Sequence, residues 1–504
     1  MARRPRVARV RPAIDTSHHR RLVNPFEPLR VLSDDQVAHI HDSAVRYLAD
    51  EGLKILLAEA RDIYVGGGCT VDDDMIVRID PDVIAESLRT APTEFEVHAP
   101  NPERSFILGG KHLSLLPVGG PPFASDLENG RRSGTLVDQE NFLRLTQHYD
   151  VMAATSPSVE PDDIPINHRH LRSGLSTLTI TDKVPFLFSR GRDRVRDSFD
   201  LLKLRYEFES DDELAAAPRC WTNINTNSPR QIDIPMSLGI IDFARMVQPC
   251  IMTPFTLAGA MAPVTLAGAL VLQHMEVLAA VTLSQLVRPG APVIYGAFTS
   301  NVDMKSGSPA FGTPEAFKGA LASGQLARHV GLPLRSSGSS ASNTVDAQAG
   351  YETMMNTYGA MLGGANMILH AAGWQEGGLS ANFEKFIVDI EMCQMIAEIC
   401  KPVIVDDAEL ALEAITEVGP GGHFFGTQHT LDRYETAFYQ PTVFSRANFE
   451  QWTEEGQRRT DERATAVWKQ IIADFEAPPL DESIREAMTD FVERRVAEGG
   501  AAPD

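Results

Sequence analysis

Two spacings of hydrophobic residues alternate along this chain, and they indicate helices and strands in turn. Residues 33–88 open with Ser33 and an acidic first turn, and Val37, Ile40 and Ala44 follow at helical spacing. After them come eight short apolar or β-branched runs bounded by turn residues: HLSLLPV (112–118), VMAATS (151–156), VPFLFS (184–189), CWTNIN (220–225), PCIMTPF (249–255), PVIYGAF (292–298), LPLRSS (332–337) and ANMILHA (365–371). Longer helical patterns lie between the runs, at 139–149, 193–208, 234–246, 266–286, 313–329, 346–362 and 383–399.

This alternation predicts the fold class. Strands and helices that alternate eight times are typical of an α/β protein with a (β/α)8 TIM barrel, which we expect at residues 111–400. A basic N-terminal arm at 1–32, a helical region at 33–110 and a C-terminal glycine-aromatic block with a helical extension at 401–504 complete the chain. An open doubly wound sheet is the alternative, but no GxGxxG or GxxxxGKS segment follows the early strands, which disfavours nucleotide-binding forms of that fold.

Composition narrows the classes of partner. The 68 acidic residues outnumber the 46 basic ones, giving a formal net charge of -22, which argues against a nucleic-acid or anionic-membrane partner. The apolar stretch at 261–287 is interrupted by Pro263, Gln273, His274 and Glu276, so no membrane span is predicted. Five cysteines without a CxxC pair favour a reducing, cytoplasmic compartment over a disulfide framework.

The ends of the predicted strands carry the candidate substrate-binding residues, because barrels of this class place their active sites there. These residues are Trp221, Tyr295, Phe298, Arg335, His370 and Trp374. Aromatic faces suit a quaternary ammonium, which has no hydrogen to donate and is recognised through cation–π contacts. Arg335 or His370 suits a carboxylate, although an ion pair of Arg335 with Asp346 or Glu352 is an equal alternative. Side chains alternate along a strand, so each aromatic residue faces either the interior or the surrounding helices.

The segment GPGGHFFGTQHTLDRYETAFYQ (419–440) is the second candidate region, because it packs glycines, histidines and aromatics with little aliphatic filling. Gly421 and Gly422 permit close backbone approach, while His423, Phe424 and His429 offer ring faces and polar tips to a large flat group. We expect this block near the C-terminal ends of the strands. A glycine-broken turn whose aromatics face the core is the alternative.

Three spaced motifs resemble the trimethylamine methyltransferase family of corrinoid-dependent enzymes. They are YGAFTSNVDMKSGSPAFGTPEAF (295–317), VDAQAGYETMM (345–355) and the glycine-aromatic block. The resemblance implies a (β/α)8 barrel that docks a small separate corrinoid protein and presents an amine to cobalt(I). The family's founding branch carries pyrrolysine after the seventh strand, whereas this chain has RSSGSSASNTV (335–345) there. The resemblance is therefore to the branch that lacks pyrrolysine, whose substrates are quaternary amines such as glycine betaine and proline betaine.

This resemblance leads to an expected function. A quaternary amine has a neutral amine as its leaving group, so the protein need only position the substrate and exclude water, and no catalytic acid or base is assigned. No DxHxxG cobalamin signature occurs here, so the corrinoid is expected on a partner protein, with the glycine-aromatic block facing it. We further expect a homo-oligomer.

Other functions stay open at this stage. A non-catalytic quaternary-amine or corrinoid-binding barrel would need many of the same residues. A zinc site from Cys220, Cys250 and His370 is conceivable, but these ligands are isolated in sequence and no metal is assigned. A barrel lyase with a Schiff base would want a lysine at a strand end, and the eight runs contain none.

Overall fold

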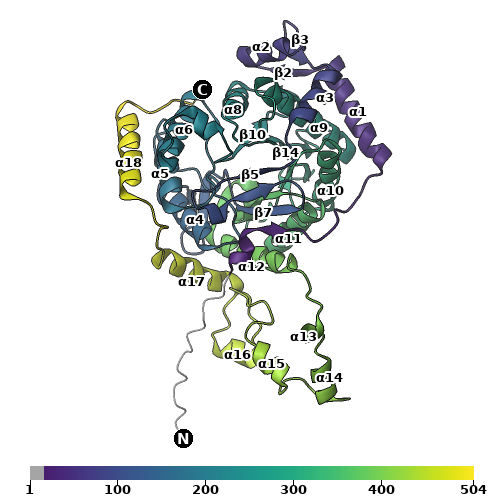
Figure 1. Cartoon of the computed structure of the whole chain (residues 1–504), viewed down its shortest axis with the longest axis vertical. Coiled ribbons are helices and arrows are strands. Elements are labelled where there is room, and N and C mark those ends of the chain that lie inside the picture. The colour runs from purple at the N-terminus through teal and green to yellow at the C-terminus, as the bar shows by residue number, and fades with distance from the viewer. Residues whose placement is uncertain (1–15, 504) are drawn as a thin grey trace.

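The computed structural model describes residues 16–503 and shows a mixed α/β protein with parallel strands at its centre and helices around them (Figure 1). In the largest sheet of these residues, every neighbouring pair is parallel except β1 with β7. The strand order is β1 (Leu22–Val23), β7 (His112–Pro117), β18 (Met367–Ala372), β17 (Leu334–Ser337), β14 (Val293–Gly296), β12 (Cys250–Pro254) and β10 (Thr222–Thr226). These six parallel strands match the first and the fourth to eighth predicted runs.

Isolated bridges take the place of regular strands between β10 and β7. Parallel bridges join Leu115 to Met152, Ala154 to Val184, and Phe186 to Trp221. The second and third predicted runs thus lie between the first and fourth, as expected, but they do not form regular strands and the regular sheet is not closed. Side chains occupy backbone groups that a ladder would use: Lys183 Nζ donates to the Met152 carbonyl at 2.6 Å, and Thr155 Oγ1 accepts from the Phe186 amide at 3.0 Å.

Helices follow the strands and start at polar capping residues. Five of these helices follow a residue whose side chain accepts a hydrogen bond from the backbone amide three residues further along the chain. The pairs are Asp233 with α8 (Ile234–Arg245), Thr265 with α9 (Leu266–Val287), Thr313 with α10 (Pro314–His329), Asp346 with α11 (Ala347–Leu362) and Asn382 with α12 (Phe383–Ile399). The earlier part of the ring holds α4 (Leu136–His148), α5 (Arg169–Ile180) and α6 (Arg192–Tyr206). The apolar helix α9 is long enough to cross a membrane but is mostly buried within the protein, as a core helix would be.

A hairpin closes one end of the strand assembly. β5 (Phe95–Val97) and β6 (Phe106–Leu108) pair in antiparallel fashion and bury Val97, Phe106 and Leu108 against interior residues of the strands. Backbone amides of His98 and Asn101 donate to the carbonyls of Pro218 and Asp182, which precede the fourth and third predicted runs. The hairpin therefore plugs the end at which the parallel strands begin.

The region before this hairpin is less purely helical than expected. It contains α1 (Asp34–Asp50), α2 (Ala58–Gly66) and α3 (Pro81–Thr90), and Ser33 forms the predicted cap of α1. A small sheet in the order β11-β2-β4-β3 joins them, made of β11 (Gln231–Ile232), β2 (Leu53–Ile55), β4 (Ile76–Arg78) and β3 (Thr70–Val71). Residues 1–15 of the predicted basic arm lie outside the described residues.

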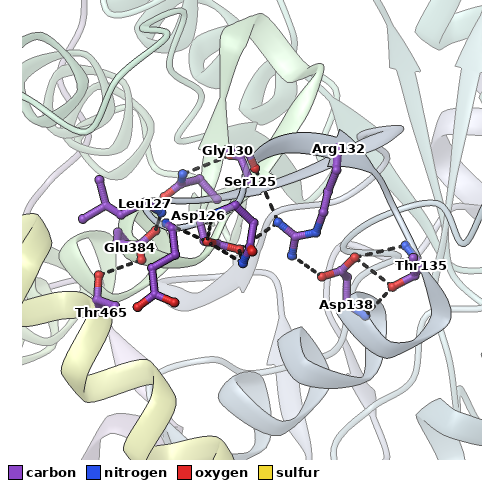
Figure 2. Close-up of polar contacts among 12 residues, drawn as sticks. Ser125, Asp126, Leu127, Gly130, Arg132, Thr135, Asp138, Glu384 and Thr465 are labelled. Carbon is purple, nitrogen blue, oxygen red and sulfur yellow. Dashed lines mark hydrogen bonds and ion pairs between the residues drawn. The ribbon is translucent and has the colours of Figure 1, made fainter.

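The last two helices of the chain pack on the outside of the ring of helices. α17 (Thr460–Ala473) packs on α12, where the buried Glu384 carboxylate accepts hydrogen bonds from Thr465 Oγ1 at 2.8 Å and Trp468 Nε1 at 2.9 Å. Figure 2 shows Glu384 beside the hairpin of β8 (Phe123–Asp126) and β9 (Gly130–Ser133). There Arg132 joins Asp126 at 2.7 Å and Asp138 at 2.6 Å, which ties the hairpin to α4. α18 (Glu482–Ala497) lies against α5 and α6.

Between α12 and α17 the chain leaves the body. Figure 1 shows this segment projecting beyond α12. It contains α13 (Asp407–Leu410), α14 (Leu412–Val418), α15 (Gln428–Arg433) and α16 (Phe449–Glu454). We refer to residues 402–449 as the projecting arm. The arm returns to α12 where Tyr439 Oη bonds to Gln394 Oε1 at 3.2 Å and the Val443 amide donates to Glu391 Oε2 at 2.7 Å.

Candidate functional site

Four of the predicted residues meet at the C-terminal ends of β14, β17 and β18. Arg335 lies on β17, His370 on β18, Phe298 just after β14, and Trp374 on β19 (Trp374–Gln375). Each of these side chains is at most 8% exposed. We call this group, together with Phe311, the strand-end cluster.

Arg335 faces the interior of the strand assembly. It pairs with Met367 of β18, whose side chain belongs to the interior apolar cluster, while the preceding Leu334 packs outward. Its Nη1 donates to the Ala297 carbonyl at 3.5 Å, and its guanidinium lies 5.2 Å from the centroid of the Phe298 ring. Within residues 16–503 no carboxylate pairs with Arg335, and its Nε has no hydrogen-bond partner. Burial lowers the pKa of this guanidinium to about 9.

His370 is turned toward Arg335 by an irregularity in β18. Leu369 already points inward, so regular alternation would send His370 to the helix layer. The register between β18 and β7 shifts between Ile368 and Ala372, and His370 adopts a φ of 61°, a conformation uncommon for residues other than glycine. Strained positions of this kind concentrate at functional sites.

Both ring nitrogens of His370 face hydrogen-bond donors. The Gly119 amide donates to Nδ1 at 3.2 Å, and Nε2 lies 3.2 Å from Arg335 Nη2. Burial, and then the positive charge of Arg335, hold the pKa of His370 well below its ordinary value, so the ring is neutral. A guanidinium only donates, so Arg335 Nη2 bonds to His370 Nε2 when the ring proton is on Nδ1, whereas the Gly119 amide bonds to Nδ1 when the proton is on Nε2. The neutral ring therefore satisfies one of these two donors and leaves the other without an acceptor.

Aromatic rings adjoin this pair of donors. The His370 and Trp374 ring centroids are 3.8 Å apart, and Phe298 lies 6.3 Å from Trp374. Phe311 completes the group at 5.5 Å from Phe298 and 6.5 Å from Trp374. The indole Nε1 of Trp374 is buried without a hydrogen-bond partner. A cavity of about 30 Å³ lies beside Phe298 and Phe311, between the ends of β14 and β17 and the helix α10, and Arg335, His370 and Trp374 do not line it.

Sequence reasoning missed Phe311 and Gly119, and it gave Glu352 a different role as a possible ion-pair partner of Arg335. Phe311 lies inside the 295–317 motif, but its position depends on the turn between β15 (Ser300–Val302) and β16 (Pro309–Ala310). Glu352 Oε2 accepts from Ser340 Oγ and from the amides of Ala341 and Ser342 at 2.8–2.9 Å. This carboxylate therefore holds the loop after β17 and is not an ion-pair partner of Arg335.

Two other predicted residues lie elsewhere. Tyr295 points outward from β14, and its hydroxyl bonds to His274 Nδ1 on α9 at 2.9 Å. Trp221 is fully buried in the interior cluster, stacks edge-on against Phe186 at 5.0 Å, and donates from Nε1 to the Thr155 carbonyl at 3.1 Å. The structure thus does not bring these rings together with Phe298 and Trp374, because alternation directs Tyr295 to the helix layer and the hairpin plug covers Trp221.

The glycine-aromatic block lies on the projecting arm and not within the strand-end cluster. Gly421, Gly422, His423 and Phe424 are exposed, and His429 is half-buried with an unpartnered Nε2. A Cβ atom placed on Gly421 would have no neighbouring atom within 4 Å, so the backbone at this position is open to a partner. The alternative, in which the aromatic residues of the block face the core, is wrong, since Phe425 is 84% exposed.

Metal-ligand geometry occurs at another place. Among the described residues, one group of potential ligand atoms lies within 4.8 Å, from His18, His19 and Glu398. It sits at the far end of α12 from the strand-end cluster, and Lys401 already pairs with the Glu398 carboxylate at 2.6 Å. Cys220 and Cys250 are free, buried thiols that do not join His370 in such a group within residues 16–503.

Comparison with known proteins gives a consistent set of relatives. The model of the family described as trimethylamine methyltransferase (MTTB) matches residues 1–500. Glycine betaine methyltransferase of Desulfitobacterium hafniense is 36% identical over 93% of this chain and 98% of that protein. Trimethylamine methyltransferase MttB of the same species is 31% identical over 93% and 95%. Proline betaine:corrinoid methyltransferase of Eubacterium limosum is 26% identical over 92% and 97%. The crystal structure of the Methanosarcina barkeri monomethylamine methyltransferase superposes with a TM-score of 0.44 at 11% identity, over 95% of this chain and 96% of that one.

Proposed function

Because this chain belongs to the trimethylamine methyltransferase family, we propose that it is a methyltransferase that moves a methyl group from a betaine to the cobalt(I) of a separate corrinoid protein. Glycine betaine is the first candidate substrate, since the relative that is 36% identical over nearly its whole length is named for it. Related betaines are the next, since another relative is named for proline betaine.

The observation that carries this proposal is the buried, unpaired cation Arg335. Burying a charge without a partner costs several kcal/mol, so its environment calls for an anion. The neutral ring of His370 can accept from only one of the two donors that face it, Arg335 Nη2 and the Gly119 amide, and a guanidinium in this position suits a carboxylate. Trimethylamine has no carboxylate and would leave this place unfilled, whereas a betaine fills it.

The ammonium end of a betaine would meet the aromatic part of the strand-end cluster. Phe298, Phe311 and Trp374 supply ring faces next to the carboxylate donors, and each cation–π contact contributes about 0.5–2 kcal/mol. We leave Trp221 and Tyr295 out of this cage because of their positions in the plug and the helix layer. These rings pack against one another in the free protein, so a bound ammonium requires them to move apart.

The chemistry then asks little of the protein beyond positioning. The corrinoid would supply the electron pair that takes the methyl group, while the electrons of the broken C–N bond stay on nitrogen and yield a neutral tertiary amine. No proton is transferred, which agrees with a cluster whose titratable members are a cation and a neutral histidine. Arg335 and His370 hold the carboxylate, the rings orient the N-methyl groups, and the buried walls exclude water.

The fold supports access from one end. We infer that the six parallel strands and the two bridged runs together form the predicted (β/α)8 barrel, with the β5–β6 hairpin at its base. Loops that follow the strands carry exposed apolar side chains, including Val264 and Met304, each 70% exposed, and Leu379. These residues fit a docking surface for a corrinoid protein above the strand-end cluster.

The glycine-aromatic block is the proposed corrinoid contact, through Gly421, Gly422, His423, Phe424 and His429. The exposure of the block and the open backbone at Gly421 support contact with a flat group. Because the arm of a single chain projects away from the body, this contact requires the arm to be placed by another protein.

A methyl-transfer assay tests the proposal. The protein is incubated with a reduced corrinoid protein and a panel of betaines, trimethylamine and choline, while the loss of cobalt(I) is followed by absorbance. Turnover with a carboxylated quaternary amine is the expected result. Binding of betaine in calorimetry without any cobalt(I) loss would favour the alternative, a non-catalytic amine-binding barrel, and loss with trimethylamine alone would contradict the proposed substrate class.

A further inference from the structure

Two neighbouring histidines converge on one carboxylate at the end of α12. His18 and His19 lie on the short 3-10 helix η1 (Ser17–Arg20), and Glu398 lies in the last turn of α12. His18 Nε2 is 2.8 Å and His19 Nε2 is 2.9 Å from the same oxygen, Glu398 Oε1. One potential ligand atom from each of the three residues lies within 4.8 Å of the other two. We call this group the histidine–carboxylate cluster.

The direction of the two rings is unusual for consecutive residues. Each residue of a 3-10 helix is rotated by about 120° from the one before it, so neighbouring side chains ordinarily diverge. Here the ring centroids are 4.2 Å apart and both Nε2 atoms face Glu398. The ends of η1 are anchored on another carboxylate, because Thr16 Oγ1 and Arg20 Nε both donate to Asp150, at 2.9 and 3.0 Å. The protein itself therefore holds two imidazole nitrogens and a carboxylate oxygen close together.

These three ligand types suit a divalent transition ion. Zn²⁺ is bound by histidine nitrogen at about 2.0–2.1 Å and by carboxylate oxygen at about 2.0–2.2 Å, most often in tetrahedral geometry, which places ligand atoms roughly 3.3 Å apart. Each ring would have to retreat from Glu398 Oε1 by only about 0.5 Å. Ca²⁺ and Mg²⁺ prefer sites made of oxygen atoms, so the two imidazoles favour Zn²⁺ or a similar first-row ion over these cations.

Burial leaves room for a further ligand from solvent. The side chain of His19 is 3% exposed, whereas those of His18 and Glu398 are 33% and 26% exposed. An ion on these residues would thus have protein on one side and water on the other. His19 Nδ1 is buried without a hydrogen-bond partner, so moving the ring proton from Nε2 to Nδ1, as ligation through Nε2 requires, breaks no bond at Nδ1.

Lys401 distinguishes a metal site from an ordinary ion-pair cluster. Its Nζ lies 2.6 Å from Glu398 Oε2 and its side chain is 46% exposed. An ion on Glu398 Oε1 would share this carboxylate with the ammonium group, and the two positive charges would repel one another. Removal of Lys401 should therefore strengthen metal binding, although it deletes an ion pair.

We propose that His18, His19 and Glu398 bind one divalent transition ion of the Zn²⁺ class through the two Nε2 atoms and Oε1. The two hydrogen bonds to Glu398 Oε1 would be replaced by three bonds to the ion. Because η1 directly precedes β1, which pairs with β7, the ion would tie the N-terminal segment to the last turn of α12. The cluster lies at the end of α12 remote from the strand-end cluster, so the ion supports the fold and takes no part in methyl transfer.

Zinc titration of the chelator-treated full chain in calorimetry tests the proposal. The wild type should bind one Zn²⁺ per chain. Glu398→Gln and His18→Ala should each bind at least about tenfold more weakly, since loss of a ligand should exceed the roughly 10–100-fold loss that follows removal of an outer partner. His39→Ala, which removes an exposed histidine of α1, is the matched control and should keep the wild-type affinity.

Lys401→Ala should bind Zn²⁺ more tightly than the wild type. A wild-type chain that binds no Zn²⁺ would overturn the proposal, as would wild-type affinity in Glu398→Gln and His18→Ala, or weaker binding in Lys401→Ala.

Thermal unfolding separates metal ligation from a merely structural role. Saturating Zn²⁺ should raise the Tm of the wild type and leave the Tm of Glu398→Gln unchanged, because only a folded site that binds the ion is stabilised by it. If Glu398→Gln does not fold, His18→Ala makes the same comparison. A carboxylate that only forms ion pairs would lower the Tm equally with and without Zn²⁺, and that result would count against the proposal.

Glycine betaine binding keeps this proposal separate from the proposed function. Glycine betaine affinity should agree within about twofold between the zinc-loaded and chelator-treated wild type, since the two clusters share no residues. Loss of zinc binding in Glu398→Gln with intact betaine binding is the expected pattern. Betaine affinity that falls by tenfold on zinc removal would contradict the supporting role given to the ion.

Discussion

The strand-end cluster and the projecting arm are made of similar residue types, but the chain completes only the first. Both combine aromatic rings, histidine and arginine. In the cluster Arg335 is 2% exposed and is held by β17, β18 and the Phe298 ring, whereas in the arm Phe425 is 84% exposed. The buried residues of the cluster can form a binding site within one chain, whereas the exposed aromatic residues of the arm can be covered only by another molecule. The comparison separates a place for a small ligand from a place for a protein.

The largest expected effect is on Arg335. Arg335→Ala should weaken glycine betaine binding by roughly 10–100-fold, because charge-assisted hydrogen bonds contribute about 1.5–3 kcal/mol. Choline, which lacks a carboxylate, should lose less than about twofold and serves as the control ligand. Calorimetry with both ligands measures the difference. Equal losses for the two would show that Arg335 supports the fold of the cluster and does not bind the carboxylate.

Trp374 should give the next largest effect. Trp374→Ala removes a ring from the proposed cage, so betaine and choline should both bind roughly 2–30-fold more weakly, in line with one cation–π contact. Trp374→Phe should recover part of the loss. Trp452→Ala, on α16 beyond the arm, is the matched control and should bind both ligands like the wild type. Unchanged affinity in Trp374→Ala would contradict the proposed aromatic cage.

Substitutions in the glycine-aromatic block should change the dependence of the rate on the corrinoid protein and should not change betaine affinity. His423→Ala with Phe424→Ala should leave glycine betaine affinity unchanged, because both residues lie on the arm outside the cluster. In the methyl-transfer assay the same variant should require a several-fold higher concentration of corrinoid protein for half-maximal rate. Weaker betaine binding, or an unaltered dependence on the corrinoid protein, would end the proposed corrinoid contact.

The smallest effect should be that of pH. Burial lowers the pKa of Arg335 to about 9 and holds the pKa of His370 well below its usual range, so neither group titrates between pH 6 and 8. A bound carboxylate raises both pKa values, so affinity is complete below the Arg335 pKa and falls as pH rises above about 9. Calorimetry should therefore find less than about a twofold change between pH 6 and 8. A tenfold gain in affinity on going from pH 8 to 6 would mean that His370 becomes protonated when ligand binds.

Local signals in the sequence were enough for most of the fold. Ser33, Thr265 and Asn382 precede helices and cap them as their residue types predict. Six of the eight runs became parallel strands in one sheet. The runs at 151–156 and 184–189 did not, because Lys183 and Thr155 side chains bind backbone groups there, and such tertiary contacts leave no periodic signal.

The candidate site was only partly predictable, since it depends on which way a side chain points. Tyr295 and Arg335 both sit near strand ends, yet one faces α9 and the other faces the interior, and strand phase cannot be read from so short a run. His370 reaches Arg335 through a bulge that breaks the alternation altogether. The spatial position of the arm depends on contacts of Tyr439 and Val443 with α12, which are distant in sequence.

The β5–β6 hairpin has a consequence for the order of events. Because Val97, Phe106 and Leu108 close the end where the strands begin, we expect access to the strand-end cluster from the opposite end. Betaine, the departing tertiary amine and the corrinoid protein would all use that side. Betaine must then enter before the corrinoid protein docks, and the tertiary amine can leave only after the corrinoid protein departs. Steady-state kinetics should accordingly be compulsorily ordered, and excess corrinoid protein should inhibit turnover by trapping the enzyme without its substrate.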